Sequence, residues 1–132
     1  MKYELTKELE TGNPIIDTEH KELFNAVNTL MDACALGKGR ATVKPTLEFF
    51  LSYVDKHFAH EEQLQKQHKY PNMDSHFLFH KNYKNRLKEV STEILAHDTT
   101  VNDLSNLNKE IAVLISHIKI EDKRVGQYIH NN

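Results

Sequence analysis

Residues 47–64, LEFFLSYVDKHFAHEEQL, decide the fold of this chain. Apolar residues recur in this segment every three or four positions, which is the period of one face of an α-helix. His57 and Glu61 stand one turn apart on that same face. Because a buried polar group without a partner costs about 1–3 kcal/mol, a core-facing histidine and glutamate predict that the core contains something for them to bind.

Three further segments repeat this pattern of an apolar helical stripe that carries polar side chains. The expected boundaries are Asp17 or Thr18 to residues 37–39 for the first helix, Thr42 for the start of the second, Asp74 for the start of the third, and a turn at residues 98–100 before the fourth. Pro45 is expected in the first turn of its helix, and residues 1–16 show no period and predict an irregular arm. Since short connections make successive helices antiparallel neighbours, the sequence predicts an all-α, up-down-up-down four-helix bundle.

The composition excludes several classes of protein. The net charge is −2, and no block of lysine and arginine is present that would bind a nucleic acid. No apolar run approaches the roughly 20 residues that span a membrane, and residues 1–4 lack the apolar segment of a signal peptide. Cys34 is the only cysteine, which excludes an internal disulfide. We therefore expect residues 1–132 to form a single cytoplasmic domain without a nucleic-acid or membrane partner.

Five histidines and two carboxylates share the apolar faces of the four helices, and together they predict a metal centre. The candidate ligands are His20, His57, Glu61, His76, His80, His117 and Asp122. The pairs His57 with Glu61 and His76 with His80 are spaced by four residues, so each pair can reach the same metal or two adjacent metals. An isolated pair of this kind is weak evidence, and His20 alone would suit a core histidine bonded to a carbonyl. The coincidence across four helices carries the prediction.

The remaining polar residues are given ordinary roles. Asp17 is expected to cap a helix, and solvent exposure is expected for His60, Glu62, His68, His97, Lys119, Glu121, Lys123, Arg124 and His130. A zinc protease is excluded because Leu64 stands where the second histidine of HExxH is required. No histidine follows a glutamate by three positions, which excludes the ferritin-like di-iron pattern. One haem would use at most two histidines and leave the others without a role.

Four motifs in order along the chain resemble those of the bacterial hemerythrins, single-domain non-haem di-iron proteins that bind O2. The motifs are IDTEHKEL at residues 16–23, HFAHEE at 57–62, Tyr70-Pro71 followed by His76 and His80, and His117-Ile118 with Asp122. Helical spacing alone favours Glu121, four residues after His117, as the last carboxylate. The family pattern favours Asp122, which requires a local helix distortion or an oblique approach. The chain departs from the family in having no tryptophan and in having Glu19 where glutamine is usual.

The resemblance implies two iron ions joined by an oxo or hydroxo bridge, with Glu61 and Asp122 bridging both. It implies that His76, His80 and His117 complete the coordination of one iron, while His20 and His57 leave a position on the other for O2. Four apolar residues next to these ligands are expected to line the O2 pocket: Leu23, Phe58, Leu114 and Ile118. The expected function is reversible O2 binding for transport, storage or delivery, without catalysis.

Two other functions are compatible with the same residues. One is an O2-sensing or redox-sensing domain that signals to a protein partner, which the sequence does not identify. The other is a di-iron enzyme that acts on peroxide or nitric oxide, or in the repair of iron clusters.

Overall fold

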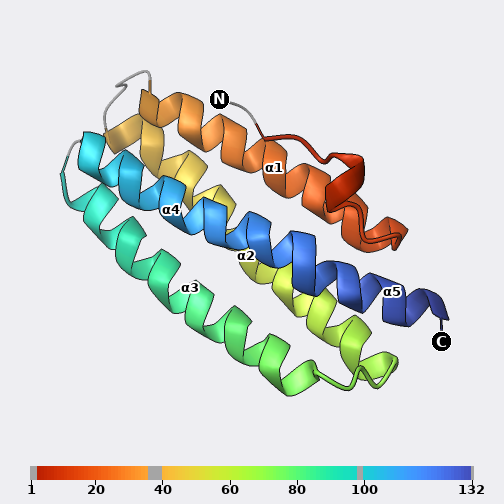
Figure 1. Ribbon diagram of the computed structural model, residues 1–132. Coiled ribbons are helices and arrows are strands. Elements are labelled where there is room, and N and C mark those ends of the chain that lie inside the picture. The colour runs from red at the N-terminus through yellow and green to blue at the C-terminus, as the bar shows by residue number, and fades with distance from the viewer. Residues whose placement is uncertain (1–2, 36–39, 98–99, 132) are drawn as a thin grey trace.

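The computed structural model describes residues 3–35, 40–97 and 100–131 as a bundle of antiparallel helices (Figure 1). The long helices are α1 (Pro14–Ala35), α2 (Arg40–Gln67), α3 (Met73–Ala96) and α4 (Val101–His117). A π-helix, η2 (Ile118–Asp122), and a short helix, α5 (Lys123–Asn131), continue the course of α4. Each long helix contacts the next one along the chain, and α1 also contacts α4, so the bundle is closed. The predicted fold class is confirmed.

The first helix begins earlier than the sequence predicted. Asn13 caps it, because the Asn13 side-chain oxygen accepts hydrogen bonds from the amides of Ile15 and Ile16 at 3.0 and 3.1 Å. Pro14 then takes the first helical position, where its missing N–H is not needed. The predicted capping role of Asp17 is wrong, since Asp17 lies inside α1. The predicted end at residues 37–39 lies outside the described residues.

The other helix boundaries agree with prediction to within a few residues. α2 begins at Arg40 rather than near Thr42, so Pro45 lies inside the helix and not in its first turn. α3 begins one residue before Asp74. Of the predicted third turn, residues 98–99 lie outside the described residues, and Thr100 caps α4 in a reciprocal pair of hydrogen bonds with Asp103.

The apolar core falls into two clusters along the bundle. The larger cluster includes Leu23, Phe50, Leu87 and Leu114, which come from the four long helices, and the smaller one joins Ile16, Tyr70 and Val125. On α1, His20 lies between Ile16 and Leu23, one turn from each. The predicted ligands therefore occupy a layer between the two clusters.

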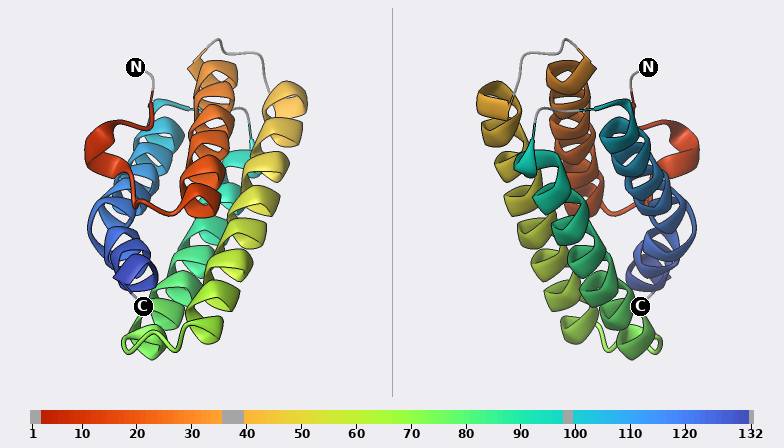
Figure 2. Two further views of the ribbon diagram at one scale, coloured as in Figure 1. Left: turned by 90° about the vertical axis from the view of Figure 1, so that its right-hand side faces the viewer. Right: turned by 90° about the vertical axis from the view of Figure 1, so that its left-hand side faces the viewer.

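The N-terminal arm, residues 3–13, lies beside the run of α4, η2 and α5 (Figure 2). It contains a single 3-10 turn, η1 (Lys7–Leu9), which contacts η2. The arm thus packs against the C-terminal part of the described chain at η2. Among the described residues, no helix combines the length and the apolar character needed to cross a membrane.

Candidate metal centre

The structure brings all seven predicted ligands together in the middle of the bundle. Each of them is buried, and His117, the most exposed of the seven, retains only 6% of its accessible surface. α1 contributes His20, α2 contributes His57 and Glu61, and α3 contributes His76 and His80. His117 is the last residue of α4, and Asp122 is the last residue of η2.

These side chains form two groups of potential donor atoms. The first group contains Glu61, His76, His80, His117 and Asp122, and the second contains His20, His57, Glu61 and Asp122. Within each group the donor atoms all lie within 4.8 Å of one another, a separation that one metal ion can span. Glu61 and Asp122 belong to both groups, so each carboxylate faces two potential metal positions.

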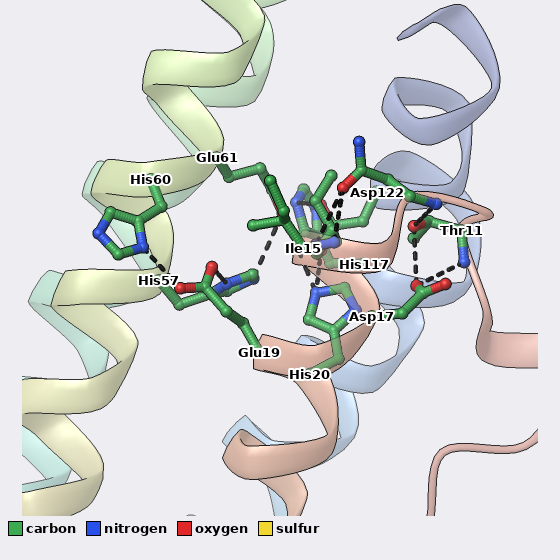
Figure 3. A network of polar contacts seen from close by, with 12 residues as sticks. Thr11, Ile15, Asp17, Glu19, His20, His57, His60, Glu61, His117 and Asp122 are labelled. Carbon is green, nitrogen blue, oxygen red and sulfur yellow. Dashed lines mark hydrogen bonds and ion pairs between the residues drawn. The ribbon is translucent and has the colours of Figure 1, made fainter. Parts of the chain in front are cut away.

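The two oxygens of each carboxylate point to different groups of histidines. Oε1 of Glu61 lies 2.6 Å from Nε2 of His76 and 3.3 Å from Nε2 of His80, while its Oε2 lies 3.3 Å from Nε2 of His57. The two oxygens of Asp122 also face different histidines. Its Oδ1 lies 3.1 Å from Nε2 of both His76 and His117, and its Oδ2 lies 3.1 Å from Nε2 of His20 (Figure 3).

Several buried polar atoms in this layer form no hydrogen bond with the described residues, although most of them lie within ion-pair distance of a neighbouring side chain. They are both ring nitrogens of His20, Nε2 of His57, Nε2 of His80, Oε2 of Glu61 and Oδ1 of Asp122. Buried polar atoms are rarely left unsatisfied in native proteins. Imidazole nitrogens and carboxylate oxygens are ligands for iron, zinc and manganese, so this set of donors fits a pair of metal ions.

The π-helix explains how Asp122 reaches the centre. In an ideal α-helix, a residue five positions after His117 lies about 140° around the axis from it. A π-helix closes its hydrogen bonds over five residues, so it turns more slowly, and η2 covers residues 118–122. Asp122 is buried at 1% exposure, whereas the side chain of Glu121 is 40% exposed and pairs with Arg124. The expected helix distortion is confirmed.

Two carboxylates outside the donor groups hold histidines of those groups in place. Oε1 of Glu19 lies 3.0 Å from Nδ1 of His57, and Oε2 of Glu62 lies 2.8 Å from Nδ1 of His80. An acceptor at Nδ1 keeps the proton on that nitrogen and leaves Nε2 free for a metal. In both rings Nε2 is the nitrogen that faces Glu61.

The prediction that His60 and Glu62 are simple solvated residues is therefore wrong. Both are half-buried, and Nδ1 of His60 lies 2.5 Å from the second oxygen of Glu19 (Figure 3). His60 consequently fixes the carboxylate that orients His57. Helical-wheel reasoning missed these contacts because long side chains at the edge of a stripe reach around the helix to a neighbour. His68, His97 and His130 stay outside both donor groups.

The pKa values of the buried histidines reflect the carboxylates around them. Burial alone lowers the pKa of His57, but its hydrogen bond to Glu19 and the nearby carboxylate of Glu61 outweigh burial and raise the pKa to about 10. For His76, burial again lowers the pKa, and the carboxylates of Asp122 and Glu61 raise it to about 9. Without metal, both imidazoles are therefore protonated on both ring nitrogens and positively charged at neutral pH.

The two shared carboxylates shift in the opposite direction. Burial and the charge of Asp122 raise the pKa of Glu61, but contacts with the surrounding histidines prevail and lower it to about 2. Burial also raises the pKa of Asp122, and its histidine contacts lower it well below the ordinary value. A metal ion that enters must displace protons from the imidazoles and meets carboxylates that are already ionised.

Aromatic rings stack on two histidines of the donor groups. Phe58 lies parallel to His80 with 3.8 Å between ring centroids, and Phe79 lies parallel to His117 at 3.7 Å. The sequence predicted Phe58 as a neighbour of the centre, but it gave no indication of Phe79. Gln65, one turn after Glu61, was also missed; it is fully buried, and neither polar atom of its side chain has a partner among the described residues.

The four apolar residues predicted beside the ligands are all in the core. Leu23, Phe58, Leu114 and Ile118 have at most 1% exposure and belong to the larger apolar cluster. Each lies within three residues of a histidine of the donor groups along its own helix. All four side chains are therefore closed off from solvent.

Comparison with known proteins agrees with this arrangement. The family profile of the hemerythrin HHE cation binding domain matches residues 11–129. A bacteriohemerythrin of Pseudomonas paraeruginosa is 30% identical over 115 residues, which cover 87% of this chain and 73% of the relative. A myohemerythrin of Theromyzon tessulatum is 29% identical over 107 residues, covering 81% and 77% of the two chains. A bacteriohemerythrin of Campylobacter jejuni is 26% identical over 124 residues, covering 92% and 91%.

Proposed function

Because this chain belongs to the hemerythrin family, we propose that it binds O2 reversibly at a pair of iron ions held by the two donor groups. In this proposal His76, His80 and His117 would hold one iron, His20 and His57 would hold the other, and Glu61 and Asp122 would each offer an oxygen to both. When bound, two ferrous ions would supply the two electrons that reduce O2 to the level of peroxide, and they would take these electrons back when O2 is released.

The sharing of two carboxylates between the donor groups is the observation that carries the proposal. A site for one metal requires its ligand atoms to converge on one point, whereas the two oxygens of Glu61 face different sets of histidines. The numbers of donors also differ between the groups, with three histidines in one and two in the other. The metal with two histidines has fewer protein ligands, so it is the one with room for O2.

The chain's own residues favour binding over turnover. The apolar side chains of Leu23, Phe58, Leu114 and Ile118 are proposed to face the bound O2 and to keep out water and acids. No catalytic residue is assigned, because the histidines and carboxylates of the layer are proposed as metal ligands or as hydrogen-bond partners of those ligands. The protein is therefore proposed to be an O2-binding protein and not an enzyme.

Anaerobic reconstitution with ferrous iron tests this function, because imidazole ligands also suit zinc and copper. The expected result is about two irons per chain, since the two donor groups share two carboxylates. The reduced protein should be nearly colourless, gain visible absorption on exposure to O2, and lose it again under argon over repeated cycles.

Two results would contradict the proposal in different ways. Saturation at one metal per chain would exclude the paired site. A single irreversible oxidation with hydrogen peroxide released in stoichiometric amount would exclude reversible binding and favour an oxidase or peroxidase. A sensor would bind O2 reversibly as well, so a specific protein partner recognised only in one oxidation state would identify that role.

A further inference from the structure

The π-helix η2 carries Asp122 at its last position and interrupts an otherwise α-helical run. Such turns are rare and depart from the regular hydrogen-bond pattern of the helix around them. Asp122 lies in both donor groups, so the shape of η2 affects both potential metal positions. Contacts that hold η2 from outside the bundle therefore bear on the whole centre.

Two lysines that flank Asp122 hold the N-terminal arm at Glu8. Nζ of Lys119 lies 2.5 Å from the Glu8 carboxylate, and Nζ of Lys123 donates to the backbone carbonyl of Glu8 at 3.1 Å. The hydrogen bond and charge of Lys119 lower the pKa of Glu8, so this carboxyl is ionised at neutral pH. Exposed ion pairs stabilise a protein only weakly, and Glu8 and Lys119 are more than half exposed.

A tighter contact lies one turn after Asp122, where the arm crosses α5. A Cβ atom built on Gly126 would meet the carbonyl oxygen of Thr11 at 2.4 Å and the Thr11 Cβ at 2.7 Å. Only glycine allows the backbone of the arm to approach the helix this closely. Both residues are buried, so this contact is part of the packed interior.

Asp17 fixes the other side of the same arm segment to the start of α1. Its Oδ1 accepts hydrogen bonds at 2.8 Å from both the amide and the hydroxyl of Thr11, and its Oδ2 accepts one at 3.2 Å from the amide of Gly12 (Figure 3). Gly12 has a φ of +87°, a conformation that lets the chain turn from the arm into α1. Thr11 is therefore held between α1 and α5, and its position does not depend on a metal.

From these contacts we propose that Glu8, Thr11, Asp17 and Gly126, called here the arm contacts, are positioning residues for Asp122. They hold η2 and α5 against the bundle from outside, so that the Asp122 carboxylate faces the histidines before metal arrives. This inference rests on the proposed metal centre for its consequence, but the arm contacts themselves involve no metal ligand.

The substitution Gly126→Ala tests the proposal most directly, because the new methyl group forces Thr11 away from α5. Hydrogen–deuterium exchange of the metal-free protein should become faster at residues 118–123, with the rest of the helices unchanged. Affinity for ferrous iron should fall about 10–100-fold, the usual effect of losing an interaction that orients a metal ligand. Gln127→Ala is the matched control, since Gln127 is exposed and lies next to Gly126 on α5.

A second variant keeps the test decisive if Gly126→Ala disrupts folding. Glu8→Lys places a third positive charge against Lys119 and Lys123 at an exposed position, and it should produce the same two changes to a smaller degree. Glu4→Lys makes the same change of charge at an exposed arm residue that has no ion pair with the described residues. Circular dichroism checks that each variant retains its helices.

The proposal would be overturned if hydrogen–deuterium exchange at residues 118–123 were as slow in Gly126→Ala and in Glu8→Lys as it is in the unsubstituted protein. It would also be overturned if each variant and its control changed the exchange rate and the iron affinity equally. Such a result would mean that the change does not come from the loss of the arm contact. A wild-type chain that binds no iron would refute the metal centre alone, while the exchange comparison on metal-free protein would still decide the role of the arm contacts.

Discussion

Replacing Asp122 by alanine should destabilise the metal-free protein strongly, whereas replacing its neighbour Glu121 should not. Asp122 is buried at 1% exposure and lies 3.1 Å from Nε2 of His20, of His76 and of His117. Its removal leaves three buried histidines without this partner, among them His76, whose pKa is raised to about 9 and which is therefore positively charged at neutral pH. The loss of one partner from a buried ion pair costs about 3–5 kcal/mol.

The expected loss in the free energy of unfolding is much smaller for Glu121→Ala. Its side chain is 40% exposed and pairs at 3.2 Å with Arg124, which is 60% exposed. Exposed pairs of this kind contribute about 0–1 kcal/mol. The two variants remove the same charge from adjacent positions, so a nonspecific electrostatic effect would be equal in both.

Urea denaturation at neutral pH with a chelator present, followed by circular dichroism, measures the two free energies of unfolding. Domains of this kind unfold with about 5–15 kcal/mol, so Asp122→Ala should remain folded in water with a clearly lower midpoint. Iron titration of the same proteins should give full binding for Glu121→Ala and the loss of paired binding for Asp122→Ala. Equal losses, or the opposite ranking, would refute the assignment of Asp122 to the centre.

Three further changes test other parts of the site. Glu62→Ala should weaken iron binding about 10–100-fold in a metal titration, because Glu62 orients His80 through Nδ1; unchanged affinity would mean that this contact is incidental. The metal-free protein should lose stability as the pH rises, because the folded-state pKa values of about 10 for His57 and about 9 for His76 exceed the ordinary 6.5. Their contribution is complete below pH 6.5 and is lost as the pH rises through 9 to 10, so urea midpoints that increased over this range would contradict it. Gln65→Met should raise the free energy of unfolding of the metal-free protein by about 1–3 kcal/mol, since it removes two buried polar atoms at nearly constant volume; a decrease in the urea midpoint would show that the amide has a partner.

The sequence predicts most of the donor layer because α-helical geometry is regular. Residues four apart on an apolar stripe must point the same way, which brings together His57 with Glu61 and His76 with His80. The number of stripes and the short connections then imply a closed bundle. No tertiary information was needed for these steps.

The position of Asp122 could not be derived in the same way. Regular α-helical spacing favours Glu121, and only the resemblance to the hemerythrins selected Asp122. A π turn leaves no periodic signal, because it changes the course of the helix at one place and the stripe resumes after it. Two of the arm contacts, Glu8 and Thr11, come from the opposite end of the chain, where the sequence shows no pattern.

The outer hydrogen bonds were missed for a different reason. Whether Glu62 or His60 reaches a neighbouring helix depends on the separation and rotation of that helix, which a helical wheel does not contain. The start of α1 could have been predicted better, since Asn13 followed by Pro14 is a typical cap and first position of a helix.

The contact between Glu8 and Lys123 joins residues that are 115 positions apart in the sequence. Contacts between distant parts of a chain form late in folding, because a long loop must close before they stabilise anything. During synthesis the arm is made before the helices, and its partners on η2 and α5 follow only when residues 119–126 have been made. By then His20, His57, Glu61, His76 and His80 are already available, so Asp122 is expected to be the last ligand to take its place, and a partly synthesised chain would present histidines to metal without the second carboxylate.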